Sequence, residues 1–179
     1  LWATPFLMTV LGIERVDASN LNMLIPVGVI LGAPFIGWLT GRFGLAKARA
    51  LGTIVLIYAI TWIGIIWFHA QIGIWGLGAS LLVMGIAGGG FISTLWGFIQ
   101  ETTPADNLGL MSGMLNPAPF FGVAVYQVIT GAILDRNTDV TALYTLSGFQ
   151  NAFTVCFVSI LVCLALTFIL KRTSSSGVA

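Results

Sequence analysis

Long apolar runs alternate with short polar stretches along this chain, and most of the runs are long enough to cross a membrane as helices. A hydrocarbon core of about 30 Å needs about 20 helical residues, each with a rise of about 1.5 Å. Five runs reach that length: residues 20–41, 50–68, 72–100, 108–134 and 149–170. A shorter run at residues 1–13 predicts a partial span. The pattern predicts an all-α, polytopic membrane helix bundle over residues 1–172, with five complete transmembrane helices plus one truncated.

The composition agrees with a membrane protein and narrows its partners. Hydrophobic residues make up 58% of the chain and charged residues 7%, whereas about a quarter of a soluble domain is charged. The apolar composition makes the lipid bilayer an expected partner. The net charge of +1 provides no basic surface for nucleic acid, so we expect no nucleic-acid partner. The chain begins at Leu1 inside an apolar run. We therefore expect a fragment of a longer protein; that its amino-terminal half is missing is implied only by the family resemblance described below.

The basic residues predict which ends of the helices face the cytoplasm. The loop at residues 42–49 carries three basic residues and no acidic one, and short loops rich in Lys and Arg stay on the cytoplasmic side. This orientation also places the polar tail at 173–179 in the cytoplasm. It gives five basic residues inside and two outside. The inner five are Arg42, Lys47, Arg49, Lys171 and Arg172, and the outer two are Arg15 and Arg136. We expect an integral protein of the bacterial inner membrane.

One face of the span at 108–134 is polar at membrane depth. Ser112, Asn116, Val123, Gln127 and Thr130 follow one another at spacings of 4, 7, 4 and 3 residues, which aligns them along one side of a helix. A lipid-facing amide is costly, so these side chains face protein or a wet cavity. The alternatives are solute contact and hydrogen bonding between helices, worth about 0.6 kcal/mol.

The candidate solute-binding residues follow from this stripe and from the preceding span. They are Asn116, Gln127, Tyr126, Ser93 and Trp96.

Glycines mark two further places in the chain. Gly28 and Gly32 have the spacing that allows close contact between helices. Gly85, Gly88, Gly89 and Gly90 leave one region of the span at 72–100 without side chains. In that region either a neighbouring backbone approaches or the helix bends.

Groups that could support catalysis or metal binding are sparse. The acidic residues all lie in loops or at the ends of spans, and His69 is the single histidine. We expect His69 to be a solvated residue at the outer end of its span. Cys156 and Cys163 are seven residues apart in one apolar run, about 10 Å along a helix, so they cannot bridge. The sequence predicts no catalytic residue, no metal, no cofactor and no enzyme activity.

Two stretches resemble a known family. Gly37, Leu39, Gly41, Arg42, Phe43 and Gly44 look like the signature G-x-L-x-D-R-x-G of the major facilitator superfamily, with Gly41 in place of the usual Asp. The segment from Glu101 through Pro104, Gly109, Gly113 and Asn116 to Gly122, Gly131 and Asp135 is similar to the family's loop and penultimate helix. Asn107 and Leu108 stand where that loop often has a basic residue. The chain resembles the carboxyl-terminal half of such a transporter.

The resemblance implies a function and a set of gating residues. The partial span corresponds to the family's seventh helix and the complete spans to its eighth to twelfth, of which the ninth and twelfth pack outside the cavity. It implies secondary transport of a small-molecule solute by alternating access. The implied gating residues are Gly37, Gly41, Gly44, Arg42 and Glu101, with a latch between the last two. A channel or a non-transporting scaffold is the alternative, and an intramembrane enzyme is a more distant one.

Overall fold

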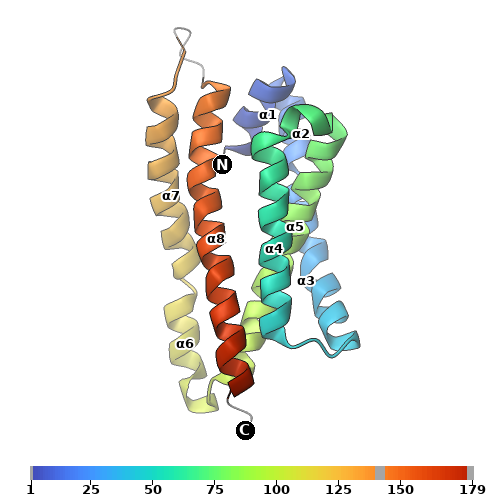
Figure 1. The fold of residues 1–179 in the computed structure, drawn as a ribbon, viewed down its shortest axis with the longest axis vertical. Coiled ribbons are helices and arrows are strands. Elements are labelled where there is room, and N and C mark those ends of the chain that lie inside the picture. The colour runs from blue at the N-terminus through green and yellow to red at the C-terminus, as the bar shows by residue number, and fades with distance from the viewer. Residues whose placement is uncertain (1, 140–143, 177–179) are drawn as a thin grey trace.

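The computed structural model is a bundle of long helices that run alternately up and down (Figure 1). It describes residues 2–139 and 144–176, with side chains as far as Phe168. Five segments are long and apolar enough to cross a membrane, which confirms the predicted all-α membrane bundle. The side chains of Lys171 and Arg172, and residues 177–179 of the predicted tail, lie outside the described residues.

The first three helices form one partial and one complete crossing. α1 (Ala3–Leu11) ends at Gly12, whose φ of 64° is left-handed. α2 (Arg15–Asn22) begins after Glu14 and runs into α3 (Leu24–Arg42), with a turn at Met23. This span therefore begins at Arg15 rather than at residue 20, because the polar residues after Glu14 are already helical.

α4 (Lys47–Trp67) and α5 (His69–Thr102) are joined by Phe68 alone. The chain therefore turns sharply at Phe68, and it bends again at Gly73, where a φ of 59° interrupts α5. Residues with a Cβ rarely adopt this backbone conformation. His69 lies inside this corner and is only 8% exposed. Its ring packs edge-on against Phe6, with centroids 6.1 Å apart, and its Nδ1 lies 3.3 Å from the Ile66 carbonyl oxygen. The expectation of a solvated histidine is wrong, because α1 covers this end of the bundle.

The span predicted over residues 108–134 is built from two helices. After the short 3₁₀ helix η1 (Ala105–Asn107) come α6 (Leu108–Leu115) and α7 (Ala118–Asp135), with a break at Asn116 and Pro117. Proline has no N–H and its ring crowds the preceding turn, so Pro117 ends the regular hydrogen bonding of α6. α8 (Leu146–Ser176) returns alongside α7 to the far end (Figure 1).

α3 and α5 make the most intimate helix contact in the described bundle. A Cβ placed on Gly28 would lie 2.5 Å from the Leu82 carbonyl oxygen and 2.8 Å from the Gly85 Cα. Gly32, Gly85 and Gly89 likewise have backbone of the facing helix where a Cβ would be. We call these four glycines the glycine seam. Gly85 and Gly89 therefore allow a neighbouring backbone to approach closely, which is one of the two roles predicted for the glycines in the span at 72–100; the other was a bend of the helix.

The two ends of the bundle differ in packing. The end opposite Arg42 and Lys47 holds an aromatic core in which the rings of Phe6 and Phe153 meet edge-on at 5.1 Å, and those of Phe6 and Phe149 at 5.7 Å. The other end, called the basic end here, is hollowed between the ends of α3 and α5 and the start of α4. The bundle thus has an aromatic core at one end and a hollow at the other.

Candidate functional site

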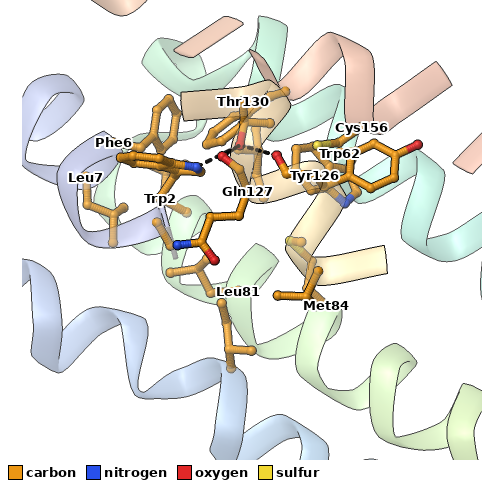
Figure 2. Close-up of a pocket in the computed structure, with 16 residues that line it drawn as sticks. Trp2, Phe6, Leu7, Trp62, Leu81, Met84, Tyr126, Gln127, Thr130 and Cys156 are labelled. Carbon is orange, nitrogen blue, oxygen red and sulfur yellow. Dashed lines mark hydrogen bonds between the residues drawn. The ribbon is translucent and has the colours of Figure 1, made fainter. Parts of the chain in front are cut away.

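A cavity of about 280 Å³ lies beneath the aromatic core, and we call it the central pocket. Its walls come from α1, α3, α4, α5, α7 and α8, so residues far apart in the sequence meet there (Figure 2). The rings of Trp2, Phe6, Trp62, Tyr126 and Phe153 form much of the wall. Together they make an apolar, concave surface of the kind that binds small molecules.

One hydrogen bond ties the start of α1 to α7 at the edge of the central pocket, and a second one within α7 orients it. Trp2 Nε1 donates to Thr130 Oγ1 at 2.8 Å, and this hydroxyl donates to the Tyr126 backbone oxygen at 2.6 Å. Thr130 is buried, at 3% exposed. Its hydroxyl is thereby occupied as both donor and acceptor, and it fixes the indole of Trp2 over the pocket.

Tyr126 contributes its ring to the pocket while its hydroxyl serves another contact. The hydroxyl makes a short hydrogen bond with the Ser159 hydroxyl of α8, which itself donates to the Val155 carbonyl oxygen at 3.2 Å. Either hydroxyl can donate in this pair, because both protons rotate freely. The hydroxyl therefore points toward α8, away from the amide of Gln127 (Figure 2).

Gln127 projects its amide into the open part of the central pocket, toward Leu81 (Figure 2). In the described part of the chain, this amide has no hydrogen-bond partner. Gln127 lies near the midpoint of α7, at membrane depth. The side chain is exposed in the described structure, so the amide lies at the open side of the pocket, where water or a solute can pair with it.

The indole nitrogen of Trp62 is a second polar atom at this pocket. Trp62 lines the pocket from α4, and its buried Nε1 makes no hydrogen bond of regular geometry among the described residues. Its polar neighbour is Tyr58, one turn earlier on α4, whose side chain interacts with the indole and whose ring centroid lies 6.4 Å away. The pocket thus combines an apolar wall with the exposed amide of Gln127 and an indole N–H beside Tyr58.

A second hollow of about 600 Å³ opens at the basic end. It is lined by several of the predicted gating residues, namely Gly37, Gly41, Gly44 and Glu101. At its rim Glu101 Oε1 lies 2.6 Å from Lys47 Nζ. In this structure Glu101 pairs with Lys47, which starts α4 beside the end of α5, whereas Arg42 ends α3 with an exposed side chain. The latch between Arg42 and Glu101, expected when the cytoplasmic side is closed, stays a prediction.

The remaining predicted solute-binding residues lie away from the central pocket. Ser93 lines the basic-end hollow, and its hydroxyl lies 3.0 Å from the Gly90 carbonyl oxygen. Trp96, three residues further along α5, is half-buried. Asn116 is exposed at the break between α6 and α7. The structure brings together Tyr126 and Gln127 of the five predicted residues.

The polar stripe on residues 112–130 is divided by the helix break. Val123, Gln127 and Thr130, which follow Pro117, all line the central pocket. Ser112 and Asn116 precede Pro117 and are absent from the pocket's lining as described. Pro117 itself was the sequence signal for this division, since a proline inside a helix breaks its regular geometry.

Sequence reasoning missed the contributions of α4 and α8, the helices that the resemblance places outside the cavity. Trp62 and Ile65 of α4, and Phe153 and Cys156 of α8, line the central pocket. No short motif links these positions, because they meet only when the helices pack. Trp62 carried the one available signal, an indole N–H in the middle of an apolar run, which usually needs a partner when buried.

Comparison with protein families gives a match over nearly the whole chain. The family model described as Major Facilitator Superfamily matches residues 1–178. Neither the curated proteins nor the solved structures gave a significant match.

Proposed function

Because the chain belongs to the major facilitator superfamily, a family of membrane transporters, we propose that it forms half of a secondary transporter that moves a small solute by alternating access. The match of the family over residues 1–178 carries the proposal. The geometry supports it, since the bundle has an aromatic core at one end, a hollow at the other and a pocket between them. Such a pocket, reached from one side at a time, suits alternating access.

In this proposal the central pocket is the solute site of this half. Gln127 supplies a polar contact to the solute, and the aromatic ring of Tyr126 forms part of the wall. The hydrogen bond from Trp2 to Thr130 holds α1 against α7. The basic-end hollow, with Gly37, Gly41 and Gly44, forms part of the passage to the cytoplasm. The pair of Lys47 and Glu101 at its rim is a gating contact.

The proposed orientation puts the basic end in the cytoplasm of a bacterial cell. Arg42, Lys47 and Arg49 gather at this end, and the positive-inside rule favours it. Single cysteines introduced at Lys47 and at Asn137 test it with a reagent that does not cross membranes. We expect labelling from outside in intact cells at Asn137 only; labelling from outside at Lys47 alone contradicts the orientation.

Counterflow distinguishes the proposed transporter from its alternatives. The complete protein is reconstituted in liposomes, and uptake of a panel of charged and uncharged radiolabelled solutes is measured with and without unlabelled solute inside. A carrier gives saturable uptake that the internal solute accelerates, because the loaded carrier returns faster than the empty one. Flux that neither saturates nor responds to internal solute indicates a channel, and absence of flux across the panel indicates a scaffold.

A further inference from the structure

We propose that the basic-end hollow binds a phosphate-type oxyanion, carried by a membrane lipid or by a soluble phosphate ester, and that this anion takes the ammonium of Lys47 from Glu101. The inference goes beyond the proposed function, because it concerns a site away from the central pocket and is tested by binding alone. Three features of the hollow lead to it. They are a buried hydroxyl without a partner, unpaired backbone N–H groups and an ammonium whose carboxylate partner is exposed.

One face of α5 arranges the ligand groups in a row along the hollow. Thr94, Gly97 and Glu101 all line it, and at spacings of three and four residues their Cβ positions lie about 5 to 6 Å apart. The ammonium of Lys47 lies over the middle position, because a Cβ placed on Gly97 would be 2.8 Å from Lys47 Nζ. The ammonium is therefore flanked by Glu101 on one side and by Thr94 on the other.

The hydroxyl of Thr94 is buried without a partner. Thr94 is only 5% exposed and lines the hollow, yet its Oγ1 makes no hydrogen bond with any described residue. The neighbouring hydroxyls differ, since Ser93 donates to the Gly90 carbonyl oxygen at 3.0 Å and Thr40 to that of Ile36 at 2.9 Å. A buried donor left unpaired costs free energy, so a ligand oxygen that accepts the Thr94 proton is favoured.

The start of α4 adds backbone donors to the same hollow. Ala46 and Lys47 line it, and no side chain caps the helix. The N–H groups of Ala46, Lys47 and Ala48 make no hydrogen bond within the described residues, whereas the N–H of Arg49 donates to the Ala46 carbonyl oxygen at 2.9 Å. Such first-turn N–H groups point out of the helix end, where the helix dipole favours negative charge.

The charges at the hollow favour an anion that displaces a weak competitor. Lys47 and Glu101 are the charged residues of its described lining, and Arg42 and Arg49 add positive charge at the same end. The Glu101 side chain is 60% exposed, so it can turn into water. A tetrahedral oxyanion has oxygens in several directions and can contact Lys47, Thr94 and the N–H groups of α4 together. A carboxylate, which has two oxygens, satisfies fewer of these donors.

Calorimetric titration of the complete protein with sodium phosphate and with glycerol 3-phosphate tests the site. In phosphatidylcholine nanodiscs we expect both to bind saturably, and acetate to bind at least about tenfold more weakly. The titration is repeated with phosphatidylglycerol in the nanodiscs, and with oleate, which adds negative charge without phosphate. If a lipid is the ligand, phosphatidylglycerol weakens phosphate binding much more than oleate does, because its headgroup occupies the site. If a soluble ester is the ligand, the two anionic lipids act alike.

Matched variants assign the binding to these residues. Thr94→Val keeps the side-chain shape and should weaken phosphate about tenfold, as should Lys47→Met. Glu101→Gln should strengthen phosphate binding about threefold by removing the competitor for Lys47, a gain that a misfolded protein does not show. Thr102→Val is the control, because that hydroxyl already donates to the Phe98 carbonyl oxygen of its own helix at 2.8 Å, and it should leave the affinity unchanged.

The outcomes separate this inference from the proposed function. Absence of saturable phosphate binding, or an affinity unchanged in both Thr94→Val and Lys47→Met, overturns the inference. Weaker binding in Glu101→Gln contradicts the exchange of Lys47 between the carboxylate and the anion. If counterflow is observed without a phosphate site, the transporter proposal stands alone. If phosphate binds as expected and no solute gives counterflow, the anion site stands and the transport proposal fails.

Discussion

The contact between α3 and α5 and the contact between α7 and α8 are built in opposite ways. Along the glycine seam the two backbones touch, and every seam glycine has a facing backbone atom where a Cβ would be. Along α6 and α7 the glycines Gly109, Gly113 and Gly122 have no neighbour within 4 Å of that position in the described structure. There side-chain hydrogen bonds hold α7, one between Tyr126 and Ser159 of α8 and one from Trp2, at the start of α1, to Thr130.

The difference separates a rigid part of the molecule from a part that can shift. Close-packed backbones have no alternative arrangement at low cost, because interiors tolerate added volume poorly. A hydrogen bond between side chains can break and re-form as helices move, at about 1 kcal/mol each. We therefore expect α3 and α5 to move as one body and α7, broken from α6 at Pro117, to be the helix that moves beside the central pocket.

The largest effect is expected from a methyl group placed in the glycine seam. Gly89→Ala puts a Cβ against the Val29 backbone and should lower the free energy of unfolding by about 1 to 3 kcal/mol, the usual cost of overpacking. The measurement is a denaturant titration of the complete protein in mixed micelles. Gly88→Ala is the matched control, since nothing lies within 4 Å of its Cβ position, and it should be neutral or stabilising by up to about 1 kcal/mol.

Equal losses for Gly88→Ala and Gly89→Ala would remove the contrast between the two regions. The loss would then come from the glycine run as such and not from the approach of α3. Gly113→Ala in α6 extends the control to the other region, and we expect a result close to that of Gly88→Ala.

An intermediate effect is expected from cutting the hydrogen bonds that hold α7. Thr130→Val keeps the shape of the side chain and removes the hydroxyl that joins Trp2 to Tyr126. It should lower the free energy of unfolding by about 0.5 to 1.5 kcal/mol. Thr61→Val is the control, because Thr61 bonds only to Ile57 of its own helix, at 2.9 Å. A loss in Thr61→Val as large as that in Thr130→Val would mean that α7 is not held by this bond between helices.

The smallest effect is expected from the ion pair at the basic end. Lys47 and Glu101 are 29% and 60% exposed in their side chains, and exposed pairs contribute about 0 to 1 kcal/mol, less at high salt. In double-mutant cycles on the free energy of unfolding, Glu101→Gln should couple to Lys47→Met and not to Arg42→Met. Coupling to Arg42 alone would restore the latch that the family resemblance implies.

The sequence predicted the features that depend on one helix or on one repeated spacing. Span number and length follow from hydropathy, and the close approach at Gly28 and Gly32 follows from their four-residue spacing. Gln127 was identified because an amide at membrane depth is costly wherever it points. These predictions need no knowledge of which helices are neighbours.

The features that depend on neighbours were missed. His69 is buried because α1 lies over the corner between α4 and α5, and nothing in the residues around His69 encodes that cover. Glu101 pairs with Lys47, which starts α4, while Arg42 ends α3, and the four residues 43–46 separate the two basic residues. The central pocket joins Trp62 to Phe153, 91 positions apart in the chain (153 − 62), so its wall is a property of the packed bundle.

The glycine seam also determines an order of events during synthesis. Its two helices are not consecutive, so α3 enters the membrane before its partner exists. From Arg42, the end of α3, to Thr102, the end of α5, the ribosome adds 60 residues (102 − 42), which takes about 3 to 12 s at about 5 to 20 residues per second. During that interval the bare glycine face of α3 is covered only by lipid or by a helper protein. The bundle can complete its most rigid contact only after α5 has emerged.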